Sequence, residues 1–241
     1  MSYPVGITFI IPAYNEEGNV VSCVNSIQKE VLRHPELKYE MIVVDNNSTD
    51  NTAREAASTG AQVLFEAEKG VVFARNAGYR KAKYSYIANI DCDNKIPEGW
   101  IDIALREIEK SEVSAISGPL VYEDVSPLIT LGGEFFYLIA RSLHHLVGPT
   151  LQGGNYIIKK EVLDKMNGYD TSFDFYGEDS RTAQCASEFG TVKLIPDLWI
   201  LASPRRIKGQ GLVNTIWKYS TNYFWVCFFG KPMTNKYRDY R

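Results

Sequence analysis

The chain has 241 residues, and 45% of them are hydrophobic, which is enough for one mixed domain with a substantial core and an appendage. Its formal net charge of -3 excludes the strongly basic surface with which proteins coat nucleic acid, so we expect no nucleic-acid partner. The four cysteines form no CxxC pair and no zinc-ligand spacing, which indicates free thiols and a cytoplasmic protein. Polar residues interrupt both long apolar stretches, so we expect neither to span a membrane.

Short β-rich runs alternate with helical patterns in the first half of the chain, which predicts an α/β fold built from parallel βαβ units. Bare apolar runs, of the sort that a sheet buries on both faces, predict strands at residues 7–11, 39–44, 61–65, 84–90 and 114–121. Helices are predicted between them at residues 19–32, 51–58, 71–82 and 98–110. Gly60 follows the second helix, where the C-terminal cap requires a residue that takes positive φ.

The alternation weakens after Tyr122. Ser126 and Pro127 have the chemistry of a helix N-terminus and predict an apolar helix to about residue 145, followed by a Gly-rich loop at 152–154 and another strand. Residues 212–230 then hold seven aromatic side chains. A core helix folded back on the domain explains this density. The alternative is a helix that rests in a membrane interface, because basic residues follow it.

Polar residues follow three predicted strands, at the edge where open α/β sheets bind ligands. They lie at residues 12–17, 45–50 and 91–93. In the second segment, turn and helix-cap chemistry accounts for the polar side chains equally well. Asp91 and Asp93 are more specific, because two carboxylates so close together repel each other unless a cation or hydrogen-bond donors lie between them. Such oxygen ligands suit Mn²⁺ or Mg²⁺, which would in turn bind a diphosphate.

A series of motifs runs through the chain in a fixed order. P-A-Y-N-E lies at 12–16, V-V-D-N-N-S-T-D-N-T at 43–52, G-V-V-F-A-R-N-A-G at 70–78 and D-C-D at 91–93, and they are followed by G-G-N-Y-I-I-K-K-E at 153–161 and G-Y-D-x4-F-Y-G-E-D at 168–179. Over roughly residues 7–206, this series resembles that of the family-two glycosyltransferases. The resemblance implies a GT-A fold, a mostly parallel twisted sheet flanked by helices, with a C-terminal aromatic helical segment.

The same resemblance implies a division of the chain. Residues 1–210 would form the glycosyltransferase domain, with a nucleotide-binding half at 1–122 and an acceptor half at 123–210. Residues 211–241 would form the aromatic helical tail.

The resemblance also implies a nucleotide-sugar site made of Pro12, Tyr14, Glu16, Asp45, Arg75 and Asp91. Asp45 would accept a hydrogen bond from the base, Arg75 would stand near the base or phosphates, and Asp91 near the ribose or sugar. Asp93 would hold the Mn²⁺ or Mg²⁺ that bridges the phosphates. Taken alone, Tyr14 would be interpreted as a packing residue and Arg75 as part of a solvated helix face.

Asp179 is the implied general base, which removes the proton of the acceptor hydroxyl. Its neighbour Glu178 would orient it or bind the acceptor, although acidic residues also favour any helix N-terminus. Gly153, Gly154 and Asn155 match a loop near the donor sugar and the acceptor, although a Gly pair before a strand is more often a turn.

Arg205 and Arg206 lie in a segment that also resembles the family. They would clamp phosphate, and a solvated basic loop is an equal alternative. The chain lacks the Q-x-x-R-W element of processive synthases, which favours transfer of a single sugar. Its three histidines lie too early to complete a metal shell, and we interpret His144 and His145 as surface or interface residues.

The function implied by these roles is an inverting, metal-dependent transfer of one sugar from a nucleotide diphosphate donor, with a UDP-sugar first among the candidates. The acceptor would be a hydroxyl of a glycan or of a lipid-linked molecule, and residues 212–241 would make peripheral contact with the cytoplasmic face of a membrane. A catalytically inactive GT-A domain that binds sugar nucleotides or glycans is the alternative. A sugar nucleotidylyltransferase is disfavoured, because P-A-Y-N-E replaces the Gly-rich turn after the first strand.

Overall fold

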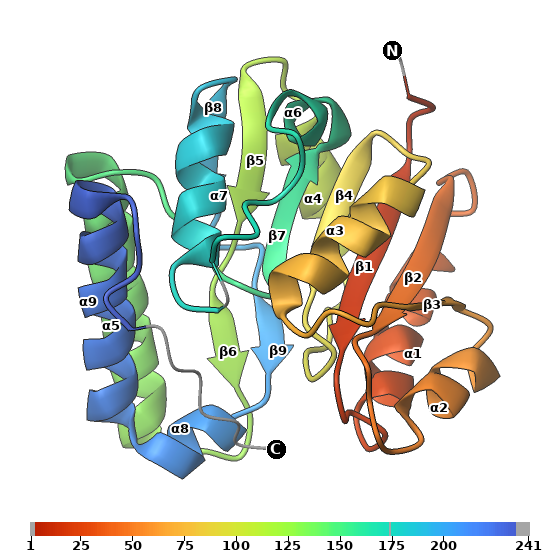
Figure 1. Cartoon of the computed structure of the whole chain (residues 1–241), viewed down its shortest axis with the longest axis horizontal. Coiled ribbons are helices and arrows are strands. Elements are labelled where there is room, and N and C mark those ends of the chain that lie inside the picture. The colour runs from red at the N-terminus through yellow and green to blue at the C-terminus, as the bar shows by residue number, and fades with distance from the viewer. Residues whose placement is uncertain (1–2, 174, 235–241) are drawn as a thin grey trace.

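The computed structural model describes residues 3–173 and 175–234. At its centre lies a seven-stranded sheet with the strand order β3-β2-β1-β4-β7-β5-β8 (Figure 1). The strands are β1 (Ile7–Ala13), β2 (Tyr39–Asp45), β3 (Gln62–Phe65), β4 (Tyr86–Ile90), β5 (Val113–Ser117), β7 (Asn155–Lys159) and β8 (Thr191–Leu194). Only β7 runs antiparallel to its neighbours, β4 and β5, so this sheet is mostly parallel, as predicted.

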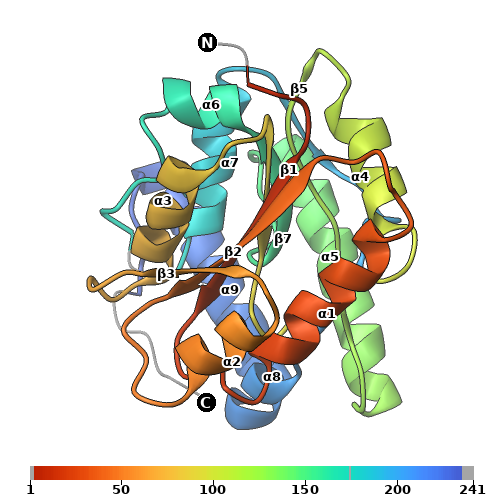
Figure 2. The same ribbon diagram turned by 90° about the vertical axis from the view of Figure 1, so that its right-hand side faces the viewer.

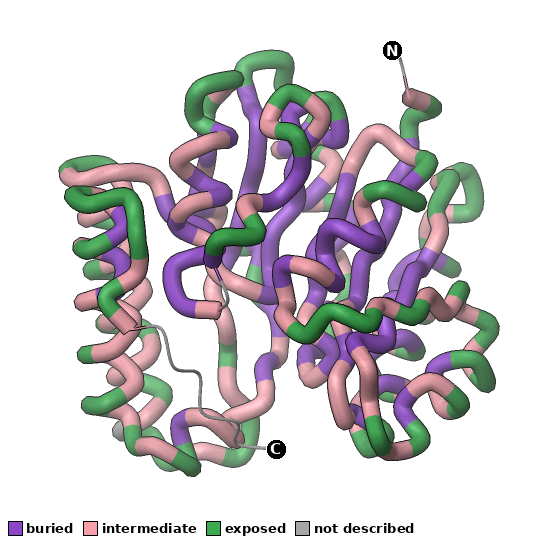
Figure 3. The backbone as a smooth tube through the Cα atoms, viewed as in Figure 1, coloured by how far each residue is buried: buried purple, intermediate pink, exposed green. Residues whose placement is uncertain are grey.

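Helices cover both faces of the sheet (Figure 2). The helices on one face are α1 (Val20–Val31), α2 (Thr52–Ser58) and α4 (Trp100–Ile108), and those on the other are α3 (Val71–Lys81), α6 (Lys160–Lys165) and α7 (Glu178–Ser187). A separate cluster of buried apolar side chains fills each interface. Phe9 and Ile10 of β1 belong to different clusters, because successive strand residues point to opposite faces. The core therefore has two layers, one on each side of the sheet. Figure 3 shows that many of the buried residues lie along the strands of the sheet.

The predictions for the first half of the chain are largely confirmed. All four predicted helices are present, and their ends lie within two residues of the expected positions. Gly60 takes a φ of 81° directly after α2, and its N–H donates to the carbonyl of Ala57 at 3.2 Å. β3 differs, because it is an edge strand whose residues are half-buried or exposed rather than buried on both faces.

The single strand predicted at residues 114–121 is wrong. β5 ends at Ser117, and the following strand β6 (Leu120–Tyr122) pairs with β9 (Ile200–Ala202) in a separate parallel sheet. Gly118 stands at the break, where an added Cβ would overlap the carbonyl oxygen of Leu198. The close approach of a distant loop divides the strand, and no local apolar pattern records that contact.

Three further helices, α5 (Pro127–Leu146), α8 (Arg205–Gln210) and α9 (Leu212–Phe229), lie beside the sheet. α5 and α9 run side by side at one end of the molecule (Figure 1). The Tyr223 O–H of α9 donates to the carbonyl of Gly148 at 2.7 Å, so the aromatic helix folds back on the domain. None of the helices in residues 3–173 and 175–234 has the length and apolarity needed to cross a bilayer. The proposed division of the chain stays a prediction, and residues 235–241 of the tail lie outside the described residues.

The carboxyl ends of β1, β2 and β4 meet at one edge of the sheet and bring the three polar segments together. The Asn46 N–H donates to the carbonyl of Ala13 at 2.8 Å, and the Glu16 N–H donates to Thr52 Oγ1 at 2.7 Å. Asp91 follows β4 at the same edge. This arrangement is the one that the parallel topology predicts for a ligand site.

Candidate active site

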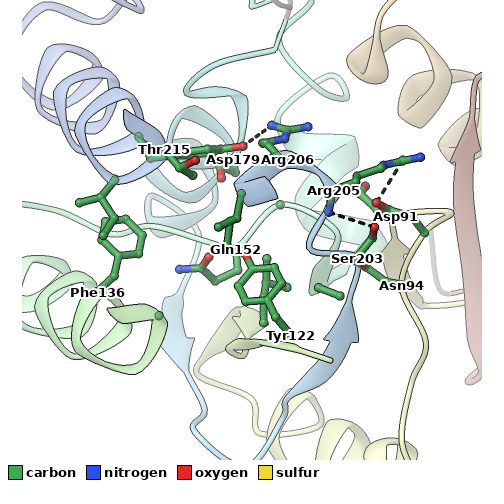
Figure 4. Close-up of a pocket in the computed structure, with 18 of the residues that line it drawn as sticks. Asp91, Asn94, Tyr122, Phe136, Gln152, Asp179, Ser203, Arg205, Arg206 and Thr215 are labelled. Atoms are coloured by element: carbon green, nitrogen blue, oxygen red, sulfur yellow. Dashed lines mark hydrogen bonds and ion pairs between the residues drawn. The ribbon is translucent and has the colours of Figure 1, made fainter. Parts of the chain in front are cut away.

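Two cavities meet at this edge of the sheet. We call the first, of about 340 Å³, the Tyr14 cavity, and its lining includes Pro12, Tyr14 and Glu16. We call the second, of about 190 Å³, the Asp179 cavity (Figure 4). Six residues line both cavities: Val71, Asp91, Asp93, Phe175, Arg205 and Arg206. A molecule that extends from one cavity into the other therefore passes Asp91 and Asp93.

Tyr14 and Lys69 lie together on the wall of the Tyr14 cavity. Lys69 Nζ donates to Tyr14 Oη at 3.1 Å and lies 4.6 Å from the centroid of the tyrosine ring. The ring therefore belongs to the cavity lining and not to the core. Lys69 adds a positive charge to a cavity that is otherwise rich in carboxylates, and sequence reasoning missed it, because the family motif begins one residue later at Gly70.

Asn46 lines the Tyr14 cavity, whereas its neighbour Asp45 is left out of the lining formed by the described residues. Asn46 Oδ1 accepts from the Gly70 N–H at 2.8 Å, and Asn46 Nδ2 donates to the carbonyl of Glu68 at 2.6 Å. Asp45 Oδ1 accepts from the Ser48 N–H at 3.2 Å, which is the turn chemistry weighed for this segment. A contact of Asp45 with a base stays a prediction.

Arg205 lies between the carboxylates of Glu16 and Asp93. Its Nη1 donates to Glu16 Oε2 at 3.0 Å, and its Nη2 contacts Glu16 Oε1 and lies 3.1 Å from Asp93 Oδ2. Burial raises the pKa of Asp93 to about 6, although the positive charge of Arg205 acts in the opposite direction. In this structure Arg205 forms ion pairs with the acidic residues of the site, and its contact with a phosphate stays a prediction.

Arg75 is buried, so it does not lie on a solvated helix face. Its Nη1 pairs with Glu178 Oε1, and its Nη2 lies 3.1 Å from Asp91 Oδ1. Burial in turn raises the pKa of Glu178, although Arg75 opposes that shift. The guanidinium of Arg75 thus connects the end of β4 to the start of α7, two segments that lie far apart in the sequence.

Gly154 supports the position of Asp91. Gly154 has a φ of 76°, and an added Cβ would lie 2.5 Å from Asp91 Oδ2, so only glycine fits there. Gly153 lines the Asp179 cavity, with the position of its absent Cβ 3.6 Å from Asp179 Oδ2. Asn155 is fully buried outside both linings, where its Oδ1 accepts from Trp100 Nε1 at 3.2 Å.

The start of α7 places Glu178 and Asp179 at the Asp179 cavity. Gly177 precedes them with a φ of 81°, and a Cβ on Gly177 would lie 2.5 Å from Val226 Cγ2 of α9. The close approach of α9 therefore requires this glycine. Asp179 Oδ1 accepts from the Ser180 N–H at 2.8 Å, and burial raises the pKa of Asp179.

The remaining wall of the Asp179 cavity comes from segments outside the recognised motifs. Aromatic side chains of β6, α5 and α9, including Tyr122, Phe136 and Tyr219, face the cavity (Figure 4). Arg206 lies among them, 4.5 Å from the ring centroid of Phe175, and its Nη1 donates to Tyr219 Oη. Sequence reasoning missed these aromatic residues, because the packing of α5 against α9 brings them to the site.

A divalent cation fits this site chemically. Asp91 and Asp93 offer oxygen ligands, and a buried carboxylate with a raised pKa, such as Asp93, is stabilised by a nearby cation. The histidines lie elsewhere: the Thr150 N–H donates to His144 Nδ1 at 3.1 Å, and His34 lies 3.8 Å from Glu30. Glu30 Oε1 accepts from the Gly99 N–H at 2.7 Å at the start of α4, so Glu30 has a structural role there.

Comparison with known proteins agrees with the fold and the motifs. The family model described as "Glycosyl transferase family 2" matches residues 8–166. Glycosyltransferase AglE of Haloferax volcanii is 31% identical over 118 residues, which cover 46% of this chain and 38% of AglE. The low-salt glycan biosynthesis hexosyltransferase Agl6 of the same organism is 26% identical over 185 residues, which cover 71% of this chain and 43% of Agl6. The chain thus matches less than half the length of either relative.

Solved structures show the same architecture. The mannosyltransferase PcManGT from Pyrobaculum calidifontis, in complex with GDP-Man and Mn²⁺, matches this chain with a TM-score of 0.70 at 23% identity. The match covers 88% of this chain and 63% of the PcManGT chain. Glucosyl-3-phosphoglycerate synthase from Mycobacterium tuberculosis, in complex with Mn²⁺, UDP and phosphoglyceric acid, has a TM-score of 0.61 at 20% identity, with coverages of 91% and 78%. These likenesses confirm the predicted GT-A fold. Because the family model covers most of the chain, the protein belongs to glycosyl transferase family 2.

Proposed function

We propose that the protein transfers a single sugar from a nucleotide diphosphate donor to an acceptor hydroxyl, with inversion at the anomeric carbon. One observation carries this proposal: Asp91 and Asp93 lie on the wall that the two cavities share, and Asp179 lines the second of these cavities but not the first. A donor in the Tyr14 cavity would thus extend its sugar toward the carboxylate of Asp179. The nucleotide complexes of the structural neighbours support a UDP-sugar or a GDP-sugar as donor, and a UDP-sugar is tested first.

The chain's own residues perform the binding and orienting steps. Tyr14, Pro12 and Lys69 line the part of the Tyr14 cavity that takes the nucleotide. Arg75 holds Asp91 in place from within the protein, and Gly154 leaves room for that carboxylate. Asp93 would hold the divalent cation, Mn²⁺ or Mg²⁺, which would supply positive charge to offset the charge on the departing diphosphate.

Asp179 is the general base in this proposal. Its Oδ1 is held by the Ser180 N–H, which leaves Oδ2 toward Gly153 and the cavity, where it takes the proton of the acceptor hydroxyl. A carboxyl whose pKa is raised by burial accepts a proton more readily near neutral pH. The hydroxyl oxygen attacks the anomeric carbon directly and the nucleotide diphosphate leaves, so no sugar becomes attached to the enzyme.

A donor screen tests the proposal. Nucleotide sugars are incubated with the protein and Mn²⁺ or Mg²⁺, with and without candidate acceptors, and the release of nucleoside diphosphate is measured. We expect metal-dependent release from one donor, and a loss of at least two orders of magnitude in both Asp93→Ala and Asp179→Asn. Binding of a donor without release would favour an inactive module that binds sugar nucleotides, and a screen without binding or release would contradict the proposed transfer and favour an inactive module that binds glycans.

We further propose that the acceptor is lipid-linked and that the α5 and α9 side of the molecule rests on an anionic bilayer. α5 exposes Leu131, Phe135 and Leu138, and α9 exposes Trp217, Phe228 and Phe229. Aromatic side chains of this kind sit well at a bilayer surface, and the exposed Lys231 that follows α9 favours anionic lipid. The same two helices supply part of the wall of the Asp179 cavity, so an acceptor in the bilayer would enter beside them.

Flotation with vesicles of anionic or neutral phospholipid tests this contact. We expect the intact chain to float with anionic vesicles, and Trp217→Ser with Phe228→Ser to abolish flotation. Leu32→Ser is the matched control, because Leu32 is 81% exposed at the C-terminal end of α1. An intact chain that stays in solution with both kinds of vesicle would contradict the membrane contact and leave the transfer chemistry unaffected.

A further inference from the structure

The guanidinium of Arg205 lies between the carboxylates of Glu16 and Asp93. We propose that Arg205 is a built-in counter-cation of the metal site, which makes binding of the divalent ion at Asp93 depend on a nucleoside diphosphate arriving with it. This inference rests on the proposed function, in which Asp93 holds the ion. It assigns Arg205 a positioning role in the order of ligand binding and not in the chemical step.

The contacts of Arg205 support this role. Its guanidinium bridges two carboxylates that come from different strand ends, Glu16 after β1 and Asp93 after β4. Glu16 is 3% exposed and Asp93 is 17% exposed, so neither can exchange the guanidinium for bulk water without cost. Arg205 itself is 27% exposed, stands at the start of a short helix and lines both cavities, so a ligand in either cavity would lie beside its guanidinium.

A divalent ion that arrives alone meets this guanidinium. To bind Asp93 Oδ2, the ion must either displace Arg205 from the carboxylate or bind beside the like charge of the guanidinium. Both alternatives weaken the binding of the ion. Displacement also disturbs the pair with Glu16, a nearly buried acid. A diphosphate offsets the first of these penalties, because its oxygens bind the ion and offer the planar guanidinium a new, charge-assisted partner.

Arg206 provides the contrast within the same segment. It lines the same two cavities, but its guanidinium lies over the ring of Phe175 and its Nη1 donates to Tyr219 Oη. The ion pairs found at Glu16 and Asp93 involve Arg205 and not Arg206 among the described residues. Arg206 is therefore a matched control that removes an equal charge from an adjacent position.

The experiment measures Mn²⁺ binding by electron paramagnetic resonance of the free ion, with and without UDP or GDP. For the intact chain we expect at least tenfold tighter binding of Mn²⁺ when the nucleotide is present. Arg205→Met should bind Mn²⁺ alone at least tenfold tighter than the intact chain and lose most of the nucleotide dependence. Arg205→Lys should stay close to the intact chain, because it keeps the charge, and Arg206→Met should leave the affinity for Mn²⁺ alone unchanged.

Two results would overturn the inference. Arg205→Met that is folded by circular dichroism, yet binds Mn²⁺ alone no tighter than the intact chain, would contradict it, and so would an equal gain in Arg206→Met. If Arg205→Met does not fold, the same comparison is made with Arg205→Gln. Failure of the proposed function is distinguishable: in that case the intact chain binds no Mn²⁺ even with nucleotide, whereas the inference alone fails if Asp93→Ala abolishes binding and Arg205→Met leaves it unchanged.

Discussion

At the site, the buried guanidinium of Arg75 and the buried carboxylate of Glu178 form an ion pair. Arg75 compensates Glu178 and Asp91 within the protein, and removal of one partner leaves a buried charge unpaired. We expect Arg75→Met to lower the free energy of unfolding by about 3–5 kcal/mol in urea titrations, and Glu178→Gln in that background to restore part of the loss. Arg54→Met, at a pair whose arginine is 74% exposed, should cost less than about 1 kcal/mol. Equal losses in the two arginine variants would contradict the proposed role of burial.

The charged form of Asp93, which the proposed function requires for binding the metal ion, is expected to lower the stability of the fold. Its pKa in the folded protein is about 6, against 3.8 for an unperturbed aspartate, so the folded state binds the proton more tightly than the unfolded state. The stability that this proton contributes is complete below pH 3.8 and is lost as the pH rises through 6. Because burial and the neighbouring carboxylates favour the neutral form of Asp93 more strongly than Arg205 favours the charged form, Asp93→Asn should be more stable at pH 8 by up to about 3 kcal/mol.

The measurement is urea unfolding of both proteins between pH 4 and pH 8. The difference in the free energy of unfolding between Asp93→Asn and the intact chain should grow as the pH rises from 4 to 6. The variant should also lose Mn²⁺ binding. A difference that is constant with pH would show that Asp93 does not titrate in this window.

At the scale of secondary-structure elements, the turn before β7 positions Asp91 through a glycine. Gly154 and Gly60 both have positive φ, of 76° and 81°, but a Cβ on Gly60 meets open space whereas one on Gly154 meets Asp91. Gly60→Ala should therefore cost only the backbone strain, about 1 kcal/mol, and leave the donor affinity unchanged. Gly154→Ala should cost more and weaken donor binding at least tenfold by calorimetry, because the Asp91 carboxylate must move. Equal donor affinities in the two variants would contradict this support of Asp91.

Local sequence patterns predict some secondary-structure elements of the molecule and miss others. The alternating units from β1 to α4 follow from local periodicity, and the polar strand ends mark the edge where Glu16 and Asp93 meet. The break at Gly118 depends on Leu198, and the burial of Arg75 depends on Glu178, which are contacts between distant segments that no local pattern contains. The wall that α5 and α9 form around the Asp179 cavity arises in the same way, so the Tyr14 cavity is more predictable from the sequence than the Asp179 cavity.

For the whole molecule, ligand binding should appear as a gain in global stability. The two cavities lie between the main sheet and the layer of α8 and α9, so a donor and its metal would contact both parts and would have no equivalent site in the unfolded chain. At a concentration of ligand 100 times its dissociation constant, the stabilisation is about 2.7 kcal/mol, which for a chain of this size raises the melting temperature by about 5–10 °C. Differential scanning fluorimetry with UDP and Mn²⁺ together should show this shift, with a much smaller one for Mn²⁺ alone. Asp93→Ala should lose the shift while still unfolding cooperatively, and an unchanged shift in that variant would place the metal elsewhere.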